Sequence, residues 1–336
     1  MSAGARGNGP VRVGLAGAGW VSEHHLDAWT ALADRATVVA IADPARQAAQ
    51  ARADRYRIPA VYDAVDAMLD RERLDVIDVA TPRELHAPIC RSAARNGVAI
   101  LCQKPLAPTL DEAAALVAEI GGRVPFMVHE NWRFRPHYRQ MHAWIREGRL
   151  GEIRGALMTV LTSGLLPDAN GALPALVRQP MLAGLERMLL MEVLIHHVDT
   201  LRFLLGPLTL KAAQLGKACD AIRGEDRAAL LMRTAAGAAV SLIGDFMACG
   251  YPPEPADGLS IIGTTGSILL HGDQLRLMDE TVQASTLDLA ANYRASYRGA
   301  IAHFLDGLEG GAPFETSPED NLETLRIVEA AYRTGG

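Results

Sequence analysis

Two glycines placed directly after an apolar run are the first feature of this chain that could bind a ligand. Residues 11–16 are typical of a buried strand, and Gly17-Ala-Gly19 leads from them into a helix-like segment. Gly17 allows a tight turn, and Gly19 leaves space for a pyrophosphate against bare backbone. Ser22 replaces the third glycine of the dinucleotide fingerprint and is small enough for close packing. The pattern predicts a phosphate site at the helix N-terminus, although an ordinary glycine turn has the same spacing.

An acid closes the next predicted strand, residues 37–42. Asp43 follows the glycines at roughly the 20-residue spacing at which a carboxylate binds an adenosine ribose. A carboxylate there repels a 2′-phosphate, so NAD is favoured over NADP; Arg46, one helical turn further on, would soften that preference. The competing interpretation is a helix cap, with Pro44 at the first helical position.

A lysine follows another predicted strand, residues 98–102. Gln103-Lys104-Pro105 comes directly after it, so Lys104 is expected at the carboxyl edge of the sheet, near the nicotinamide position. Partial burial would lower the pKa of its amine and suit it to proton transfer or carbonyl polarisation. The alternative is a solvated lysine without a catalytic role.

An acid, a histidine and a second acid share one predicted helix, residues 192–205. Glu192, His196 and Asp199 have the i, i+4, i+7 spacing of one helix face, and a histidine between carboxylates is a suitable proton acceptor. His197 points roughly 100° away on an ideal helix. Three alternatives remain: a solvent-facing pair, core histidines, or metal binding with Asp199.

The stretch from His129 to Arg133 begins at the end of a further strand. It offers polar donors and an aromatic ring, which are the partners that sugar hydroxyls need. A linker with solvated arginines is the alternative. His24 and His25, in the first helix, are expected to pack or cap.

Alternating elements must position these residues. Strand and helix patterns alternate from residue 11 to about 129, which predicts a doubly wound parallel sheet. After about residue 148, strand-like runs with little intervening helix predict an antiparallel sheet. The helix at 192–205 interrupts them, and helices at 293–308 and 318–332 close the chain. Residues 165–190 are expected to form a long loop over the site.

Length and composition agree with two domains. The 336 residues divide into an expected disordered tail (1–10), a dinucleotide-binding domain (11–130), a substrate and oligomerisation domain (131–317), and a C-terminal helix (318–336) that could return to the first domain. The net charge of −6 argues against nucleic acid and anionic membranes. No membrane-length apolar span occurs, and four scattered cysteines indicate a reduced cytoplasmic protein without a zinc site or other metal.

Together these motifs resemble the Gfo/Idh/MocA oxidoreductases, from about residue 11 to 334. The markers are Gly17-x-Gly19-x-x-Ser22 with His25, Asp43, Ala80-Thr81-Pro82 with His86, Gln103-Lys104-Pro105, Glu192-x-x-x-His196-x-x-Asp199, and the closing Leu325–Tyr332. The resemblance implies a Rossmann domain, a C-terminal domain with a large, mostly antiparallel open sheet, and assembly into homodimers or homotetramers through that sheet. It also implies a nicotinamide cofactor and hydride transfer at a sugar or polyol carbon.

The resemblance also assigns roles. Lys104 would polarise the reacting oxygen, His196 would accept the proton, and Glu192 would orient His196. The expected cofactor contacts are Gly17, Gly19, Trp20, Val21, Asp43, Thr81, Pro82, His86, Gln103 and Lys104. The expected substrate contacts are His129, Asn131, Arg133 and Asp199.

Two residues depart from the family pattern. Gln103 replaces the usual Glu and removes a charge beside Lys104, and Glu192 replaces the usual Asp.

Cys102-Gln-Lys-Pro and His129-Glu-Asn-Trp-Arg133 resemble a subset of the family, the D-apiose dehydrogenases. The sequence therefore predicts an NAD-dependent sugar or polyol dehydrogenase. An NAD-using glycoside hydrolase without net redox chemistry and a non-catalytic cofactor and sugar sensor remain as alternatives.

Overall fold

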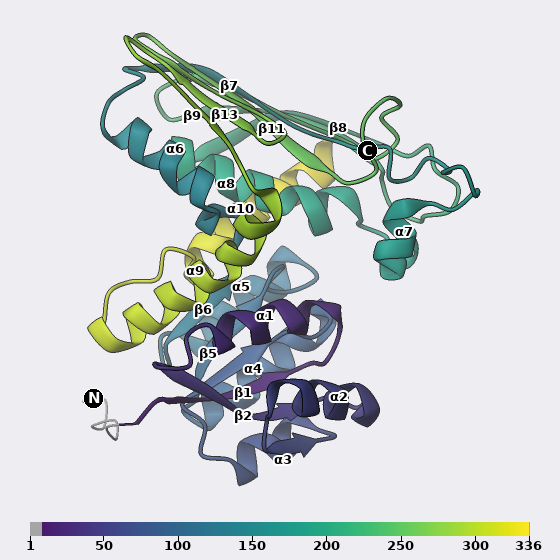
Figure 1. The fold of residues 1–336 in the computed structure, drawn as a ribbon, viewed down its shortest axis with the longest axis vertical. Coiled ribbons are helices and arrows are strands. Elements are labelled where there is room, and N and C mark those ends of the chain that lie inside the picture. Colours follow the sequence, from purple (N-terminus) through teal and green to yellow (C-terminus); the bar gives the residue numbers. More distant parts are fainter. Residues whose placement is uncertain (1–8, 336) are drawn as a thin grey trace. The chain divides into compact units, whose positions relative to one another are not determined.

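The computed structural model describes residues 9–335, which form two compact units. The first unit contains the described residues up to Asn131 together with Arg294–Leu322. The second contains Trp132–Tyr293 and Glu323 to the C-terminus. Each unit is shown in Figure 1. The predicted tail lies outside the described residues except for residues 9 and 10.

A six-stranded parallel sheet forms the first unit, in the order β3-β2-β1-β4-β5-β6. Its strands are β1 (Val11–Ala16), β2 (Ala36–Ala42), β3 (Ala60–Tyr62), β4 (Val76–Val79), β5 (Ala99–Gln103) and β6 (Phe126–His129). All of its ladders are parallel. This is the order of a Rossmann sheet, with the switch point beside β1, so the predicted fold class is confirmed.

Helices follow the strands of this sheet. They are α1 (Trp20–Thr30), α2 (Arg46–Tyr56), α3 (Val65–Arg71), α4 (His86–Arg95) and α5 (Leu110–Ile120). β4 and β5 are buried throughout, because helices cover both faces of a parallel sheet. Two helix ends in this unit have residues typical of caps. Thr109 caps α5 by accepting a hydrogen bond from the backbone of Glu112 at 3.3 Å, and Gly97 follows α4 at φ +69°.

An eight-stranded sheet forms the second unit, in the order β14-β13-β12-β11-β7-β10-β9-β8. Its strands are β7 (Ile153–Leu161), β8 (Leu208–Gly216), β9 (Arg227–Thr234), β10 (Ala239–Asp245), β11 (Ala256–Gly263), β12 (Ser267–His271), β13 (Gln274–Met278) and β14 (Val282–Thr286). Only the β7–β10 pair is parallel among the described ladders, so the mostly antiparallel sheet is confirmed. Buried and exposed residues alternate strictly along β9. This alternation indicates a sheet with one covered face.

Helices lie against that covered face. Figure 1 shows α6 (Pro136–Arg146), α8 (Ile195–Leu205) and α10 (Pro318–Thr334) on the same side of the large sheet. A π-helical turn, Leu189–Leu194, directly precedes α8 and is called the π turn below. The opposite face of the sheet carries large apolar side chains that are exposed to solvent. They include Leu157, Leu231, Ile243 and Ile262, which are 40–53% exposed.

Three expectations differ from the structure. The segment 165–190 is mainly loop but contains a short helix, α7 (Pro174–Arg178), and a 3₁₀ turn, Pro180–Gly184. The helix expected from residue 192 begins as the π turn. The return of the chain to the first unit is made by residues 294–322, which include most of α9 (Leu289–Gly310), whereas most of the C-terminal helix stays with the second unit.

Candidate functional site

The turn after β1 has the geometry that the glycine pattern predicts. Gly17 adopts φ +102°, and a Cβ atom there would collide with the carbonyl oxygen of Ala80. Gly19 is the N-cap of α1, and no atom lies within 4 Å of the position that its Cβ would occupy. No side chain caps α1, so its first N–H groups are available to an anion. The turn therefore fits a pyrophosphate, with Trp20 and Val21 in the first turn of the helix beside it.

Asp43 ties this turn to the end of β2. One carboxylate oxygen accepts a hydrogen bond from the backbone N–H of Ala18 and the other from that of Ala45, each at 2.7 Å. A carboxylate oxygen accepts more than one hydrogen bond, so Asp43 can still bind ribose hydroxyls. The competing interpretation of Asp43 as a helix cap is wrong, because α2 begins at Arg46 with Ala45 as its N-cap and without a side-chain cap.

A pocket of about 470 Å³ adjoins these residues within the first unit. Gly17, Asp43, Asp63, Asp66, Thr81 and Pro82 are among the residues that line it. Its acids disfavour a further phosphate on the ribose by like-charge repulsion. The residues present therefore fit NAD better than NADP.

His86 joins the two loops that follow β4 and β5. Its Nδ1 lies 2.8 Å from the carbonyl oxygen of Pro105, and its Nε2 lies 2.9 Å from that of Thr81. The side chain is buried. Its nitrogens thus hold the two loops that border the pocket, and the direct contact of His86 with the cofactor stays a prediction.

Lys104 follows β5 at the carboxyl edge of the parallel sheet and is half-buried. Its backbone N–H donates to Oε1 of Gln103 at 3.1 Å. The Nε2 of Gln103 lies 2.8 Å from Nε2 of His25 and 3.3 Å from Nδ1 of His129. The structure therefore brings Lys104, Gln103 and His129 together, as the strand-end argument predicted.

His25 and Asp78 complete this cluster, and the sequence analysis missed both as site residues. His25 was expected to pack or cap, yet its Nδ1 lies 2.8 Å from Oδ2 of Asp78. Both side chains are fully buried. An acid inside the otherwise apolar run Val76-Ile-Asp-Val was the available signal, because a buried carboxylate needs a hydrogen-bonding partner.

The imidazole of His196 stacks on the indole of Trp132, with ring centroids 4.3 Å apart and planes at 17°. The guanidinium carbon of Arg135 lies 3.7 Å from the centroid of the same indole. Trp132 is half-buried and His196 is buried. The predicted proton acceptor thus stacks on Trp132, for which the sequence predicted only an aromatic ring near the site.

Asp257 anchors this platform from β11. Its Oδ2 accepts hydrogen bonds from Trp132 Nε1 at 3.3 Å, Arg135 at 3.2 Å and Tyr138 at 2.7 Å. Its Oδ1 lies 2.9 Å from Nε2 of His197. Burial by itself would raise the pKa of the Asp257 carboxyl, but His197, followed by Arg135 and Tyr138, lowers it well below the usual range. No sequence motif marked Asp257.

Arg133 and Asp199 form a buried ion pair within the second unit. Arg133 Nε lies 2.7 Å from one carboxylate oxygen of Asp199, and a terminal nitrogen lies 2.5 Å from the other. Thr324 of α10 adds a hydrogen bond at 3.2 Å. The sequence predicted both residues as substrate contacts, whereas the structure pairs them with each other. Asn131, the other predicted contact nearby, donates to Ser296 at 2.7 Å and is buried.

Glu192 lies in the π turn rather than in α8, so the expected i, i+4 spacing to His196 on one α-helix is incorrect. A helix start leaves backbone N–H groups without intrahelical partners. Here Glu225 receives them: its carboxylate accepts from Leu190 at 2.9 Å and its carbonyl accepts from Leu189 at 3.2 Å. The hydroxyl of Tyr332 accepts from Met191 at 3.2 Å and donates to Glu225 at 2.7 Å. These contacts fix the backbone that presents Glu192.

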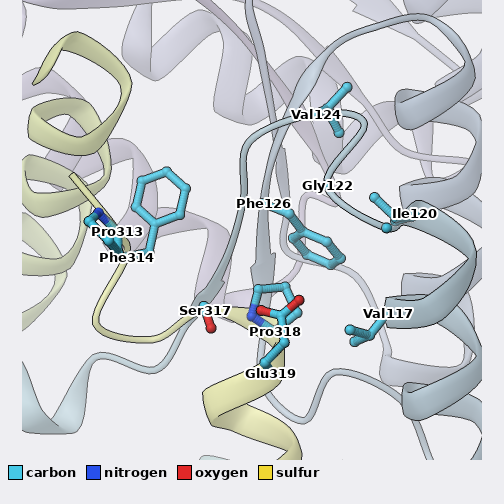
Figure 2. Close-up of a pocket in the computed structure, with 11 residues that line it drawn as sticks. Val117, Ile120, Gly122, Val124, Phe126, Pro313, Phe314, Ser317, Pro318 and Glu319 are labelled. Atoms are coloured by element: carbon cyan, nitrogen blue, oxygen red, sulfur yellow. The ribbon is translucent and has the colours of Figure 1, made fainter. Parts of the chain in front are cut away.

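A second pocket, of about 320 Å³, lies elsewhere in the first unit. Figure 2 shows Val117, Ile120, Phe126, Phe314 and Pro318 around it. Phe126 is the first residue of β6, so this pocket lies at the amino end of the strand. Cofactors bind beyond the carboxyl ends of parallel strands, so this pocket is separate from the candidate site.

No group of three or more His, Cys, Asp or Glu side chains within residues 9–335 is arranged to hold a metal ion. In that same part of the chain, no helix is long and apolar enough to cross a membrane.

Comparisons with known proteins identify the family of this chain. The family model described as "Oxidoreductase family, NAD-binding Rossmann fold" matches residues 11–123, and the one described as "Oxidoreductase family, C-terminal alpha/beta domain" matches residues 183–334. The chain is 33% identical to D-apiose dehydrogenase of Paraburkholderia graminis, over 95% of this chain and 86% of that protein. It is 28% identical to inositol 2-dehydrogenase of Rhizobium meliloti, over 96% of each.

A solved structure is also similar over the whole chain. It is an oxidoreductase from Agrobacterium radiobacter in complex with NAD⁺, L-tartaric acid and magnesium, with a TM-score of 0.89, 27% identity and 96% coverage of both chains. Both halves of the chain match models of one family, and the turn after β1 has the geometry of a pyrophosphate site. The chain therefore belongs to the Gfo/Idh/MocA family of oxidoreductases and carries that family's NAD-binding Rossmann domain.

Proposed function

We propose that this protein is an NAD-dependent dehydrogenase that oxidises a hydroxyl-bearing carbon of a sugar or polyol. The observation that carries the proposal is Lys104, held half-buried at the carboxyl edge of an NAD-binding sheet. The named relatives supply the substrate class, since one acts on D-apiose and another on inositol. Bound NAD would supply the hydride acceptor.

The chain's own residues would handle the proton. Lys104 polarises the hydroxyl oxygen, and His196 accepts the hydroxyl proton. Stacking on Trp132 favours the imidazolium that then forms, because the face of an indole attracts cations. Glu192, fixed on the π turn, orients the imidazole.

The contacts of four other predicted residues suggest a supporting role. We assign the Arg133–Asp199 pair to holding α8 in place, because a buried bidentate pair satisfies both charges. His86 and Asn131 hold neighbouring backbone and side chains in the same way. Of the four expected substrate contacts, His129 is the one that we still propose to contact the substrate.

Two alternatives are less well supported. A glycoside hydrolase that uses NAD without net redox chemistry would release product without NADH, whereas the relatives named above are dehydrogenases. A cofactor and sugar sensor needs neither Lys104 nor His196 for proton transfer, yet both are present.

We also propose that the open face of the large sheet pairs with a second copy, giving a homodimer or homotetramer. Leu157, Leu231, Ile243 and Ile262 expose apolar surface there, and contiguous exposed apolar surface marks interfaces. The free cysteines favour a cytoplasmic location. Sedimentation of the wild type and of Leu231→Glu tests the assembly; a wild type that sediments as a monomer contradicts it.

NADH formation across aldoses, apiose, inositols and sugar acids tests the proposed reaction. We expect at least one compound to yield NADH, and Lys104→Ala to lose about 100-fold or more of that turnover while its NAD dissociation constant changes little. Turnover that survives in Lys104→Ala overturns the role of the lysine. Glycoside cleavage without NADH would favour the hydrolase.

A further inference from the structure

A row of four buried polar side chains crosses the first unit below Lys104. It runs from Asp78 to His25, Gln103 and His129, and is called the buried row below. The three links between neighbours are 2.8, 2.8 and 3.3 Å long. Each of the four side chains is at most 6% exposed. Because these side chains are buried, water cannot replace a missing partner. Each link therefore needs a donor on one side and an acceptor on the other.

A backbone contact beside the row fixes the orientation of the Gln103 amide. The backbone N–H of Lys104 lies 3.1 Å from the atom assigned as Oε1, and a backbone N–H can only donate. Exchanging the amide oxygen and nitrogen would place two donors face to face. The amide nitrogen of Gln103 therefore faces the two imidazoles, and it donates to both.

The Asp78 end of the row fixes the position of the proton on His25. The indole nitrogen of Trp29, which can only donate, lies 2.7 Å from Oδ2 of Asp78. That oxygen is therefore an acceptor, and Nδ1 of His25 donates to it. On the far side of the same ring, Nε2 of His25 accepts from Gln103.

We propose that Gln103 is a positioning residue that holds both histidines as neutral imidazoles of opposite tautomer. His25 carries its proton on Nδ1. His129 accepts from Gln103 through Nδ1 and therefore carries its proton on Nε2. Gln103, directly before Lys104 in the sequence, thus keeps both histidines uncharged. Either ring would add a positive charge near Lys104 if it became protonated.

The groups that face the two rings are consistent with this assignment. Asp78 approaches His25 from β4. Tyr297 of α9 packs against both rings, with ring centroids 5.4 Å from His25 and 5.2 Å from His129. The two imidazoles lie 4.3 Å apart, so two imidazolium rings would repel each other strongly in this setting.

Imidazole NMR of the intact protein tests the proposal. Long-range proton–nitrogen spectra of ¹⁵N-histidine-labelled protein distinguish the two neutral tautomers from imidazolium. His25→Asn and His129→Gln identify the two signals by their loss. We expect the Nδ1-H form for His25 and the Nε2-H form for His129 at neutral pH. A doubly protonated ring, or the same tautomer at both positions, overturns the assignment.

Two variants of similar size test the role of Gln103 itself. In Gln103→Glu the carboxylate can only accept, so His25, which also donates to Asp78, should become imidazolium at neutral pH. His129 should move its single proton from Nε2 to Nδ1 and stay neutral. In Gln103→Met the amide is absent, so His129 should become a mixture of tautomers. Wild-type spectra from either variant overturn the role of Gln103. If one variant does not fold, the wild-type spectra and the other variant still decide the question.

Discussion

The indole of Trp132 stacks on the imidazole of His196, and the carboxylate of Asp257 holds that indole by its Nε1. Trp132 directly precedes Arg133 in the sequence, and His196 is the residue that the helix pattern predicted as the proton acceptor. The half-buried indole is thus held on one face by the stack and on one edge by the hydrogen bond.

Removing the indole should impair turnover more than substrate binding. Aromatic pairs contribute about 0.5–1.5 kcal/mol beyond the area they bury, so we expect Trp132→Leu to lower kcat by up to about tenfold. Trp132→Phe, which keeps a flat ring and loses only the bond to Asp257, should lose less. Steady-state kinetics of both variants measure this. Equal kcat in Trp132→Leu and the wild type would show that His196 does not depend on the stack.

The two glycines of the first turn should fail in different ways. Gly17→Ala forces a side chain into a positive φ and against the Ala80 carbonyl, so the free energy of unfolding should fall by about 1–3 kcal/mol. Gly19→Ala meets no atom of the protein, so stability should change by less than about 0.5 kcal/mol. Its methyl group would occupy the proposed pyrophosphate space, so NAD should bind at least about tenfold more weakly. Denaturation and NAD titration separate the two effects, and normal NAD affinity in Gly19→Ala contradicts the proposed cradle.

Asp43 should decide between the two nicotinamide cofactors. Asp43→Asn keeps an oxygen for one backbone N–H and removes the charge that repels a 2′-phosphate. Like-charge contacts at an interface cost several kcal/mol, so NADP binding should improve by about tenfold or more relative to NAD. Parallel titration with both cofactors measures the ratio. A ratio equal to that of the wild type would leave cofactor choice to other residues.

The contact between Tyr332 and the π turn should stabilise the second unit. Tyr332→Phe removes the acceptor of the Met191 N–H and one of the hydrogen bonds to the Glu225 carboxylate, so the free energy of unfolding should fall by about 1–3 kcal/mol. kcat should fall as well, because Glu192 lies on the same turn. Tyr251→Phe, at a position 47% exposed, is the matched control and should change neither. A Tyr332→Phe variant that is as stable as the control would contradict this account of the π turn.

His137 should make the protein sensitive to mild acid. Burial, followed by the nearby charge of Arg135, lowers the pKa of its imidazole from 6.5 to about 4. The pKa of this imidazole is lower in the folded protein than in the unfolded one. Its contribution to the free energy of unfolding is therefore fully present above pH 6.5 and is lost as the pH falls toward 4. Between pH 7 and pH 5 the wild type should therefore lose about 2 kcal/mol more than His137→Gln. Urea denaturation at both pH values measures the difference, and identical losses would rule out His137 as the source.

The sequence by itself was sufficient for both sheets, the cofactor turn and the positions of Lys104 and His196. These depend on local signals: apolar periodicity, glycines that need special backbone angles, and the rule that parallel strands end at one edge. Gly17 shows the point, since one positive φ after a strand was predictable from residue type alone.

Only the tertiary structure decided which side chains meet. Asp78 and Asp257 lie in strands far along the chain from the histidines that they bind. Only the structure shows that Arg133 and Asp199 are each other's partners. The π turn likewise depends on Glu225 and Tyr332, which lie well beyond it in the sequence. Buried polar groups take whichever partner the fold brings within hydrogen-bonding distance. Because that choice depends on long-range packing, spacing along one helix or strand does not reveal it.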